Sequence, residues 1–205
     1  MRPVSKTLKK TPLGAIFSLI VLAVLFYGCG PKVAFIEGYD FGRIERVGVI
    51  KFDSSQVNYF SSFDPGSAVA DEFVFQFINR GVRVVERSRL ENILREQNLW
   101  DSGRLDPETV KEAGKLLGVD ALVMGTVTRY VPDKKERIYV RDSAGRVREE
   151  IFLVEAEVGV SARMVDVETG EIIWAGSHVH ESFYIDTAIR QAVSALLNSL
   201  RGVWL

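Results

Sequence analysis

Short apolar runs alternate with segments of helical spacing in the first half of the chain. The run "ERVGVIKFD" is apolar on both faces and predicts a buried strand. In the following "GSAVADEFVFQFINRG" the apolar residues recur close to helical spacing, which predicts a helix that Ser67 caps and Gly81 ends. The positions that carry this spacing are Val69, Phe73, Phe77 and Ile78.

A second strand and two further helices are predicted next. "VRVVER" reads as a short strand, and "SRLENILREQN" as a helix in which Ser88 and Glu91 form a capping box. "DPETVKEAGKLLG" predicts another helix, with Asp106 as cap and Gly118 as terminator.

From Val119 onward the period changes to alternation. "DALVMGTVTRYV" predicts a strand, and the sequence that follows it, as far as "SHVHES", predicts a long antiparallel meander that turns at Gly170. One face of the meander is expected to be packed, at Phe152, Val154, Ala156, Val158, Val160, Ala162 and Met164.

The last segment, "DTAIRQAVSALLNSLRGVW", carries an apolar helical stripe and is expected to begin at a cap on Asp186. The predicted fold class is therefore α/β in the α+β sense, with a mixed, mainly antiparallel sheet. N-terminal strand–helix units and a long β-meander build the sheet, and the C-terminal helix covers it. The stripe consists of Ala188, Ile189, Ala192, Val193, Leu196, Leu197 and Leu200.

Residues 1–28 have the layout of a signal peptide. A basic leader without acidic residues precedes an apolar run from Leu13 to about Tyr27. Because crossing hydrocarbon takes about 20 apolar residues, export fits this run better than a permanent span.

The run ends at Cys29, the one cysteine in the chain. The stretch "LFYGCG" resembles the lipobox of bacterial lipoprotein precursors, although Phe26 and Tyr27 stand where that motif has leucine and a small residue. Since a lone thiol in an exported chain has no disulfide partner, we expect Cys29 to be the lipid attachment site. The alternative is an uncleaved signal anchor. Gly30 after the cysteine, in place of aspartate, implies by the same resemblance sorting to the outer membrane, facing the periplasm.

We therefore divide the chain into a lipoprotein signal peptide (1–28), a lipid anchor and short tether (29–44) and one domain (45–205). The leader removes four of the 26 basic residues and none of the 27 acidic residues, so the remaining chain is mildly acidic. Nucleic acid is excluded as a partner, because it requires clustered Lys and Arg.

No residues with a catalytic or cofactor-binding pattern stand out. His178 and His180 lie two apart on a predicted strand, but a zinc site needs three or four ligands, so a solvated strand face is the preferred interpretation. "AGKLLG" lacks the first glycine and the hydroxyl residue of a phosphate loop. We expect no catalytic, cofactor or metal site.

Aromatic residues are the better candidates for function, because exposed aromatics often anchor protein partners. Three aromatic residues of the loop "SSQVNYFSSF" are predicted partner contacts: Tyr59, Phe60 and Phe63. Trp174, within a predicted strand, is expected to belong to the core.

Three stretches carry a family resemblance: "VVERSRLENILREQ", "GKLLGVDALVMGTV" and "DVETGEIIW". From Glu45 to Leu205 the chain resembles CsgG-type lipoproteins of curli secretion. It is more distantly similar to the penicillin-binding-protein activators of the LpoB type. The resemblance implies a lipid-anchored periplasmic domain, and in the channel members a ring whose subunits each insert two hairpins into the outer membrane.

Both membrane hairpins depart from the channel pattern. "PDKKERIYVRDSAGRVREEIF" has charges on both faces, and Lys or Arg at the bilayer midplane costs about 2–4 kcal/mol each. Only "SHVHESFYI" stands where the second hairpin would be.

We therefore expect a non-enzymatic envelope lipoprotein that assists the assembly or secretion of a surface structure. Its expected partners are the membrane through Cys29, an envelope protein, and copies of itself in a homo-oligomer. The alternative is an LpoB-like regulator that binds and activates a periplasmic peptidoglycan synthase.

Overall fold

The computed structural model describes residues 30–55, 57, 63–85 and 107–205. The chain divides into two units, Met1–Gly30 and Pro31–Leu205, and the fold is that of the second unit. The helix predicted in "SRLENILREQN" and the cap at Asp106 lie outside the described residues.

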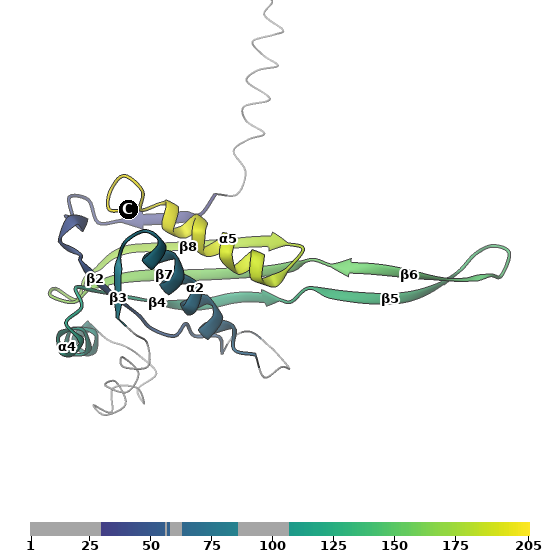
Figure 1. Cartoon of the computed structure of the whole chain (residues 1–205), viewed down its shortest axis with the longest axis horizontal. Coiled ribbons are helices and arrows are strands. Elements are labelled where there is room, and N and C mark those ends of the chain that lie inside the picture. The colour runs from purple at the N-terminus through teal and green to yellow at the C-terminus, as the bar shows by residue number, and fades with distance from the viewer. Residues whose placement is uncertain (1–29, 56, 58–62, 86–106) are drawn as a thin grey trace, which may run out of the picture. The chain divides into compact units, whose positions relative to one another are not determined.

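A six-stranded sheet forms the centre of this unit (Figure 1). Its order is β1-β8-β7-β4-β2-β3, in which β2 is parallel to β3 and β4 and every other pairing is antiparallel. The predicted mixed, mainly antiparallel fold is thus confirmed. The strands are β1 (Lys32–Phe35), β2 (Arg46–Val49), β3 (Arg83–Val85), β4 (Ala121–Val131), β7 (Ala156–Asp166) and β8 (Ile172–Ser182).

Helix α2 (Pro65–Asn79) begins earlier than predicted, because Asp64 caps it rather than Ser67. The Asp64 carboxylate accepts hydrogen bonds from the backbone N–H groups of Gly66 and Ser67, as an N-cap does. The cap at Ser67 was therefore wrong. Val69, Phe73 and Phe77 are buried as predicted, whereas Ile78 is exposed.

Helix α5 (Ile185–Asn198) covers one face of the sheet beside α2. Its N-cap is Tyr184, which makes no side-chain capping bond, and Asp186 lies one position inside the first turn. The predicted cap at Asp186 was wrong, but a carboxylate in the first turn still interacts favourably with the helix dipole. Every residue of the predicted apolar stripe is buried.

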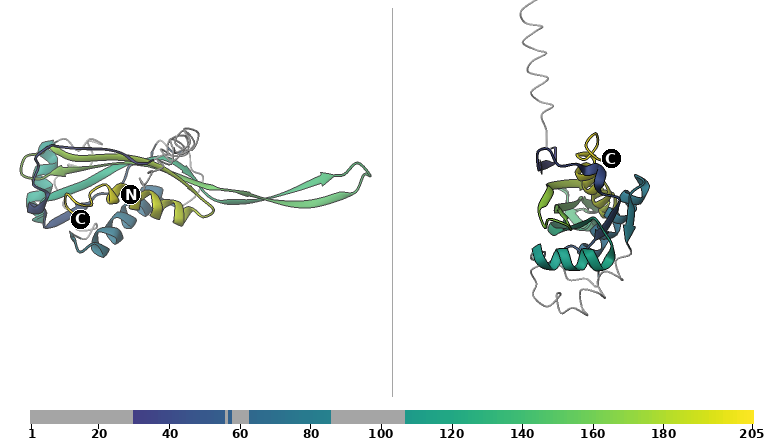
Figure 2. Two further views of the ribbon diagram at one scale, coloured as in Figure 1. Left: turned by 90° about the horizontal axis from the view of Figure 1, so that it is seen from above. Right: turned by 90° about the vertical axis from the view of Figure 1, so that its left-hand side faces the viewer.

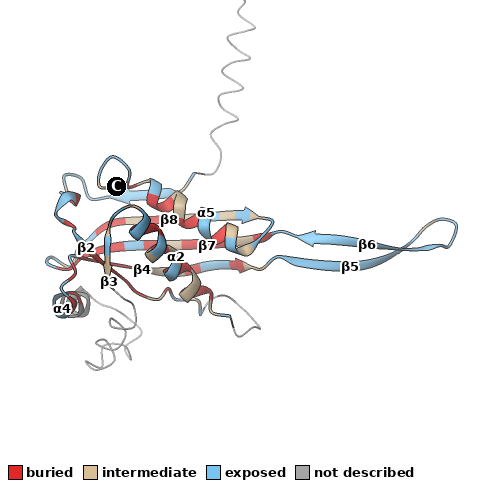
Figure 3. Ribbon diagram, in the orientation of Figure 1, coloured by how far each residue is buried: buried red, intermediate tan, exposed pale blue. Residues whose placement is uncertain are grey.

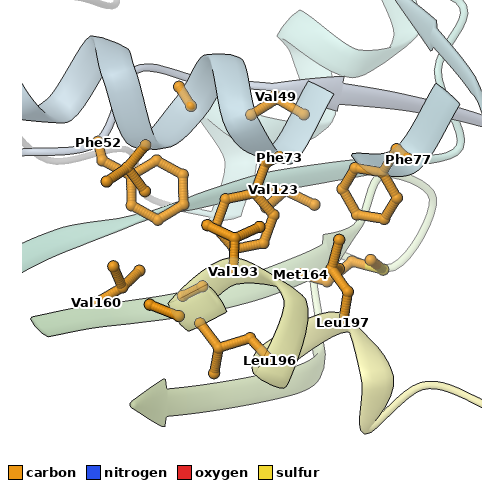
Figure 4. Close-up of a cluster of buried hydrophobic side chains, with 14 of the residues drawn as sticks. Val49, Phe52, Phe73, Phe77, Val123, Val160, Met164, Val193, Leu196 and Leu197 are labelled. Carbon is orange, nitrogen blue, oxygen red and sulfur yellow. The ribbon is translucent and has the colours of Figure 1, made fainter. Parts of the chain in front are cut away.

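The main core lies between the sheet and the helices α2 and α5 (Figure 4). The rings of Phe52 and Phe73 stack with their centroids 5.1 Å apart, and Trp174 is 1% exposed, as expected for a core residue. The indole N–H of Trp174 donates to the hydroxyl of Ser199 at 3.1 Å, which satisfies its buried polar atom.

Helix α4 (Pro107–Leu117) and the residues after it line a second cluster. This cluster joins Leu117 and Val119 to Leu122, Met124 and Val165. The predicted terminator Gly118 has a positive φ of 61°, the left-handed conformation that glycine adopts most readily at a helix end.

Two strands leave the six-stranded sheet. Strand β5 (Lys134–Arg141) follows β4 after two residues, and β6 (Val147–Val154) precedes β7 by one, so that the long β4–β7 ribbon continues into a separate two-stranded sheet (Figure 2). All sixteen residues of β5 and β6 are exposed (Figure 3). Phe152 and Val154, expected in the packed face, are therefore not packed, because the sheet and its helices end before them.

The segment predicted as tether contains a strand. β1 pairs with β8 from Lys32 opposite Ser177 to Phe35 opposite Trp174, and the short 3₁₀ helix η1 (Phe41–Arg43) follows it. Four residues with an exposed outer edge leave too weak a pattern to be read from sequence. Within the described part of the chain, no helix is long and apolar enough to cross a membrane.

Candidate protein-interaction surface

The β5–β6 hairpin (Lys134–Val154) is exposed along the whole length of both its strands. Its register pairs Lys134 with Val154 and Arg141 with Val147, and directly paired residues share a face. Within the described residues neither strand pairs with any other strand, so both outer edges present free backbone donors and acceptors.

Large apolar side chains lie on both faces of the hairpin. An isolated two-stranded hairpin is at best marginally stable in water, so this much exposed apolar surface indicates that the hairpin packs against something else. The exposed apolar side chains of the two strands are Ile138, Tyr139, Val140, Val147, Ile151, Phe152, Leu153 and Val154.

The two strands differ in charge. β5 carries four basic residues and one acidic residue, whereas β6 carries one basic residue and two acidic residues. Ion pairs within the hairpin join Lys134 to Glu136 at 2.7 Å and Arg137 to Glu149 at 3.5 Å. Lys135, Arg141 and Glu150 have no ion-pair partner among the described residues.

Phe63 is the one predicted partner contact that the structure describes. It is 42% exposed, and its ring stacks on Tyr130 with the centroids 5.8 Å apart. Since Tyr130 lies two residues before the turn into β5, Phe63 lies at the base of the hairpin. Tyr59, Phe60 and the lipid attachment site Cys29 fall outside the described residues and stay predictions.

His178 and His180 lie side by side on β8, with ring centroids 5.8 Å apart. Burial lowers the pKa of His178, and the nearby His180 lowers it further. Within the ranges that the structure describes, no three His, Cys, Asp or Glu residues are grouped so that they could hold a metal ion.

A buried carboxylate that the sequence did not single out ties the N-terminal segment to the β7–β8 turn. Asp166 is 1% exposed and accepts hydrogen bonds from the Tyr39 hydroxyl, from Arg43 Nη2 at 2.9 Å and from the Thr169 N–H at 2.8 Å. Burial alone would raise the pKa of Asp166, but these bonds and the Arg43 charge outweigh it and lower the pKa. Burial and the hydrogen bond to Asp166 raise the pKa of Tyr39.

Tyr39 and Arg43 lie 127 and 123 positions from Asp166 in sequence, so no motif could have revealed this group. Its carboxylate is fully engaged in bonds that hold the chain together, which makes it a structural element. The β5–β6 hairpin, in contrast, is suited to binding, because it offers open strand edges, exposed apolar side chains and charges without an ion-pair partner among the described residues.

Several solved structures are similar in fold. They include the PelC dodecamer from Paraburkholderia phytofirmans, with 16% identity and a TM-score of 0.45, covering 81% of this chain and 97% of that one. Lipoprotein GNA1162 from Neisseria meningitidis has 18% identity and a TM-score of 0.45, covering 76% and 96%. The LpoB C-terminal domain from Salmonella enterica has 14% identity and a TM-score of 0.42, covering 70% and 85%.

A search of curated proteins found no match. The family model described as "Curli production assembly/transport component CsgG" matches residues 45–187, well over half of the chain. Together with the fold, this match confirms the resemblance seen in the sequence: the chain belongs to the CsgG family.

Proposed function

We propose that this chain is a non-enzymatic lipoprotein of the cell envelope, anchored through Cys29 to the outer membrane and facing the periplasm. It would act as an assembly platform for a secreted or surface structure by joining copies of itself through the β5–β6 hairpin. The observation that carries the proposal is the hairpin itself, with sixteen exposed residues and two open edges.

Charge supports pairing between copies. A basic β5 edge of one subunit and an acidic β6 edge of the next attract each other, and the unpaired Lys135, Arg141 and Glu150 remain free for such contacts. A contact between two different edges is heterologous, and such contacts close into rings when the rotation between subunits permits. Backbone pairing along the edge would supply affinity, and the charges would supply orientation.

The hairpin is an unfavourable membrane span. Each face combines apolar and charged side chains, and Lys or Arg at the bilayer midplane costs about 2–4 kcal/mol each. A second hairpin of the channel type has no place between β8 and α5, since β8 ends at Ser182 and α5 begins at Ile185. We therefore propose a function without a pore formed by this chain.

The membrane anchor in this proposal is a thioether. The Cys29 sulfur displaces the headgroup phosphate from a phospholipid and takes its diacylglyceryl group, while the thiol proton leaves with the headgroup. Cys29→Ala should abolish the lipid mass and block cleavage of the signal peptide, so that the unlipidated precursor keeps its full size. If the variant had the same lipid mass and the same size as the wild type, the lipoprotein assignment would fail.

The deciding experiment is native mass spectrometry of the full-length protein extracted from membranes in mild detergent. We expect a mass at Cys29 that includes the lipid, and an oligomer that is lost when Lys135→Glu and Arg141→Glu are combined. The matched control combines Lys115→Glu with Arg190→Glu, which makes the same charge change on exposed side chains of α4 and α5. This control should keep the oligomer.

A lipid-modified monomer would contradict the platform and favour the second function. In that case the hairpin would be the binding surface for an envelope enzyme, as in an LpoB-like regulator of a peptidoglycan synthase. Exposed apolar side chains on an unpaired hairpin are compatible with such a partner as well as with a second copy.

A further inference from the structure

The two histidines of the chain lie on the face of β8 that belongs to the main core. In the sheet register His178 is opposite Val160 and His180 is opposite Val158, and directly paired residues share a face. Both valines are buried in the core, and both imidazoles are partly buried. The rings therefore lie at the margin of an apolar surface rather than on the solvated strand face that the sequence favoured.

The outer side of the histidine pair is open. β1, the outer neighbour of β8, begins at Lys32 opposite Ser177, so no described strand continues beside His178 and His180 on that side. A metal ion and the water molecules bound to it need a path to their protein ligands. The open edge of β8 supplies this path.

The two rings are placed to share one ion. Their centroids are 5.8 Å apart, and their planes are inclined by 42°. Because a Zn–N bond is about 2.0–2.1 Å long, two imidazoles on one ion have ring centres about 5 Å apart. Side-chain rotations that bring the rings together by about 1 Å would therefore let both bind the same ion.

The imidazole nitrogens are available as ligands. Neither ring makes a hydrogen bond or an ion pair with any other residue that the structure describes. A neutral imidazole has one nitrogen with a lone pair, which can bind a metal. Burial, and then the nearby His180, lower the pKa of His178 below its ordinary value of 6.5, so near neutral pH this ring has no proton to lose on metal binding.

We propose that His178 and His180 chelate one divalent transition-metal ion, and that Cu²⁺ is the ion best suited to the site. Among the described residues no third His, Cys, Asp or Glu joins the pair, so the four protein ligands of a structural zinc site are not present there. Cu²⁺ takes a tetragonal set of nitrogen and oxygen ligands, and water can fill the positions that the protein leaves open. Nitrogen sites also bind Cu²⁺ more strongly than Ni²⁺ or Zn²⁺. The site depends neither on the lipid anchor nor on the β5–β6 hairpin.

The test uses the full chain, purified in mild detergent without a polyhistidine tag and with any remaining Cys29 thiol alkylated by iodoacetamide. Calorimetric titration with Cu²⁺ should give one ion per chain, and pulsed electron paramagnetic resonance should count two imidazoles on the ion. Loss of a group that only orients a metal ligand already costs about 10–100-fold in affinity, so His178→Gln and His180→Gln should each weaken Cu²⁺ binding at least about tenfold.

A matched control keeps the composition of the chain and moves one ring. Val179→His combined with His180→Val leaves two histidines but places them on opposite faces of β8. Val179 is 48% exposed, so a histidine at this position has room, and an unchanged far-UV circular dichroism spectrum would show that the fold is intact. This exchange variant should bind Cu²⁺ no more tightly than the two glutamine variants, which decide the question by themselves if the exchange disturbs folding.

Two kinds of result would overturn the chelate. If the wild type bound Cu²⁺ no more tightly than the glutamine variants, the pair would not act as a joint ligand. A single imidazole on the ion, or one ion for every two chains, would refute a two-histidine site formed within one chain.

Discussion

Replacing Asp166 with asparagine should destabilise the domain by an amount that follows from its contacts. The carboxylate is 1% exposed and accepts from the Tyr39 hydroxyl and the Thr169 N–H. An amide offers a single acceptor oxygen, and hydrogen bonds to a charged acceptor contribute about 1 kcal/mol more than neutral ones. For these two bonds the expected loss is about 2 kcal/mol. The Arg43 contact is left out of this sum, because its guanidinium is largely in water.

The assay is urea and thermal unfolding of Asp166→Asn beside Glu168→Gln. Glu168 accepts from the same Arg43 Nη2 at 2.8 Å, but its side chain is 80% exposed, so its replacement should cost less than about 0.5 kcal/mol. For a domain of this size, about 2 kcal/mol corresponds to a fall in Tm of about 4–8 °C. If Asp166→Asn lost no more stability than Glu168→Gln, the buried carboxylate would not hold the N-terminal segment.

The pH dependence gives an independent check. The folded protein lowers the pKa of Asp166 below its ordinary value of 3.8, so the carboxylate contributes stability above that pH. This contribution is lost as pH falls through the folded pKa. The stability difference between the wild type and Asp166→Asn should therefore stay constant near neutral pH and shrink below pH 3.8. A difference that did not change in acid would refute the charge argument.

Three further changes test other parts of the fold. In Gly125→Ala, the new Cβ would lie 2.0 Å from the Ser161 carbonyl oxygen and 2.6 Å from the Phe52 ring, so we expect a loss of about 1–3 kcal/mol in urea unfolding, and an unchanged midpoint would contradict this packing. Ser199→Ala leaves the buried Trp174 N–H without its acceptor and should cost about 1–3 kcal/mol, measured in the same way. His180→Gln removes a charge that lowers the pKa of His178, so the NMR titration midpoint of His178 should rise toward its ordinary value of 6.5. A midpoint that stayed the same would show that His180 does not act on it.

Periodicity predicted most of the described elements because one face of each is buried. The stripe of α5, the alternation of β7 and the helical spacing of α2 all report a single packed side. Capping was predicted less well. Ser67 and Asp64 are both good N-cap residues, and the choice between them depends on backbone conformation: Asp64 is extended, whereas Ser67 is already inside the helix that Pro65 starts.

The candidate surface was visible in the sequence only in part. Charges on both faces of the segment 132–152 argued against a membrane span, but its separation from the main sheet did not follow from alternation, which continues through Phe152 and Val154. Strand β1 and the Tyr39–Arg43–Asp166 group also had no local signature. Both depend on partners more than a hundred residues away along the chain.

By itself, the sequence determined the order of most of the described strands and helices, the core face of most of them, and the membership of the CsgG family, because these depend on local periods and motifs. Tertiary structure alone decided where burial stops. The same alternation runs through all four strands of the long ribbon, yet most residues of β4 and β7 are buried and all residues of β5 and β6 are exposed. The reason is that the helices that cover the sheet end before the hairpin begins. It also decided that β1 joins the sheet edge at β8, because an edge strand is specified by its neighbour's free hydrogen bonds rather than by its own side chains.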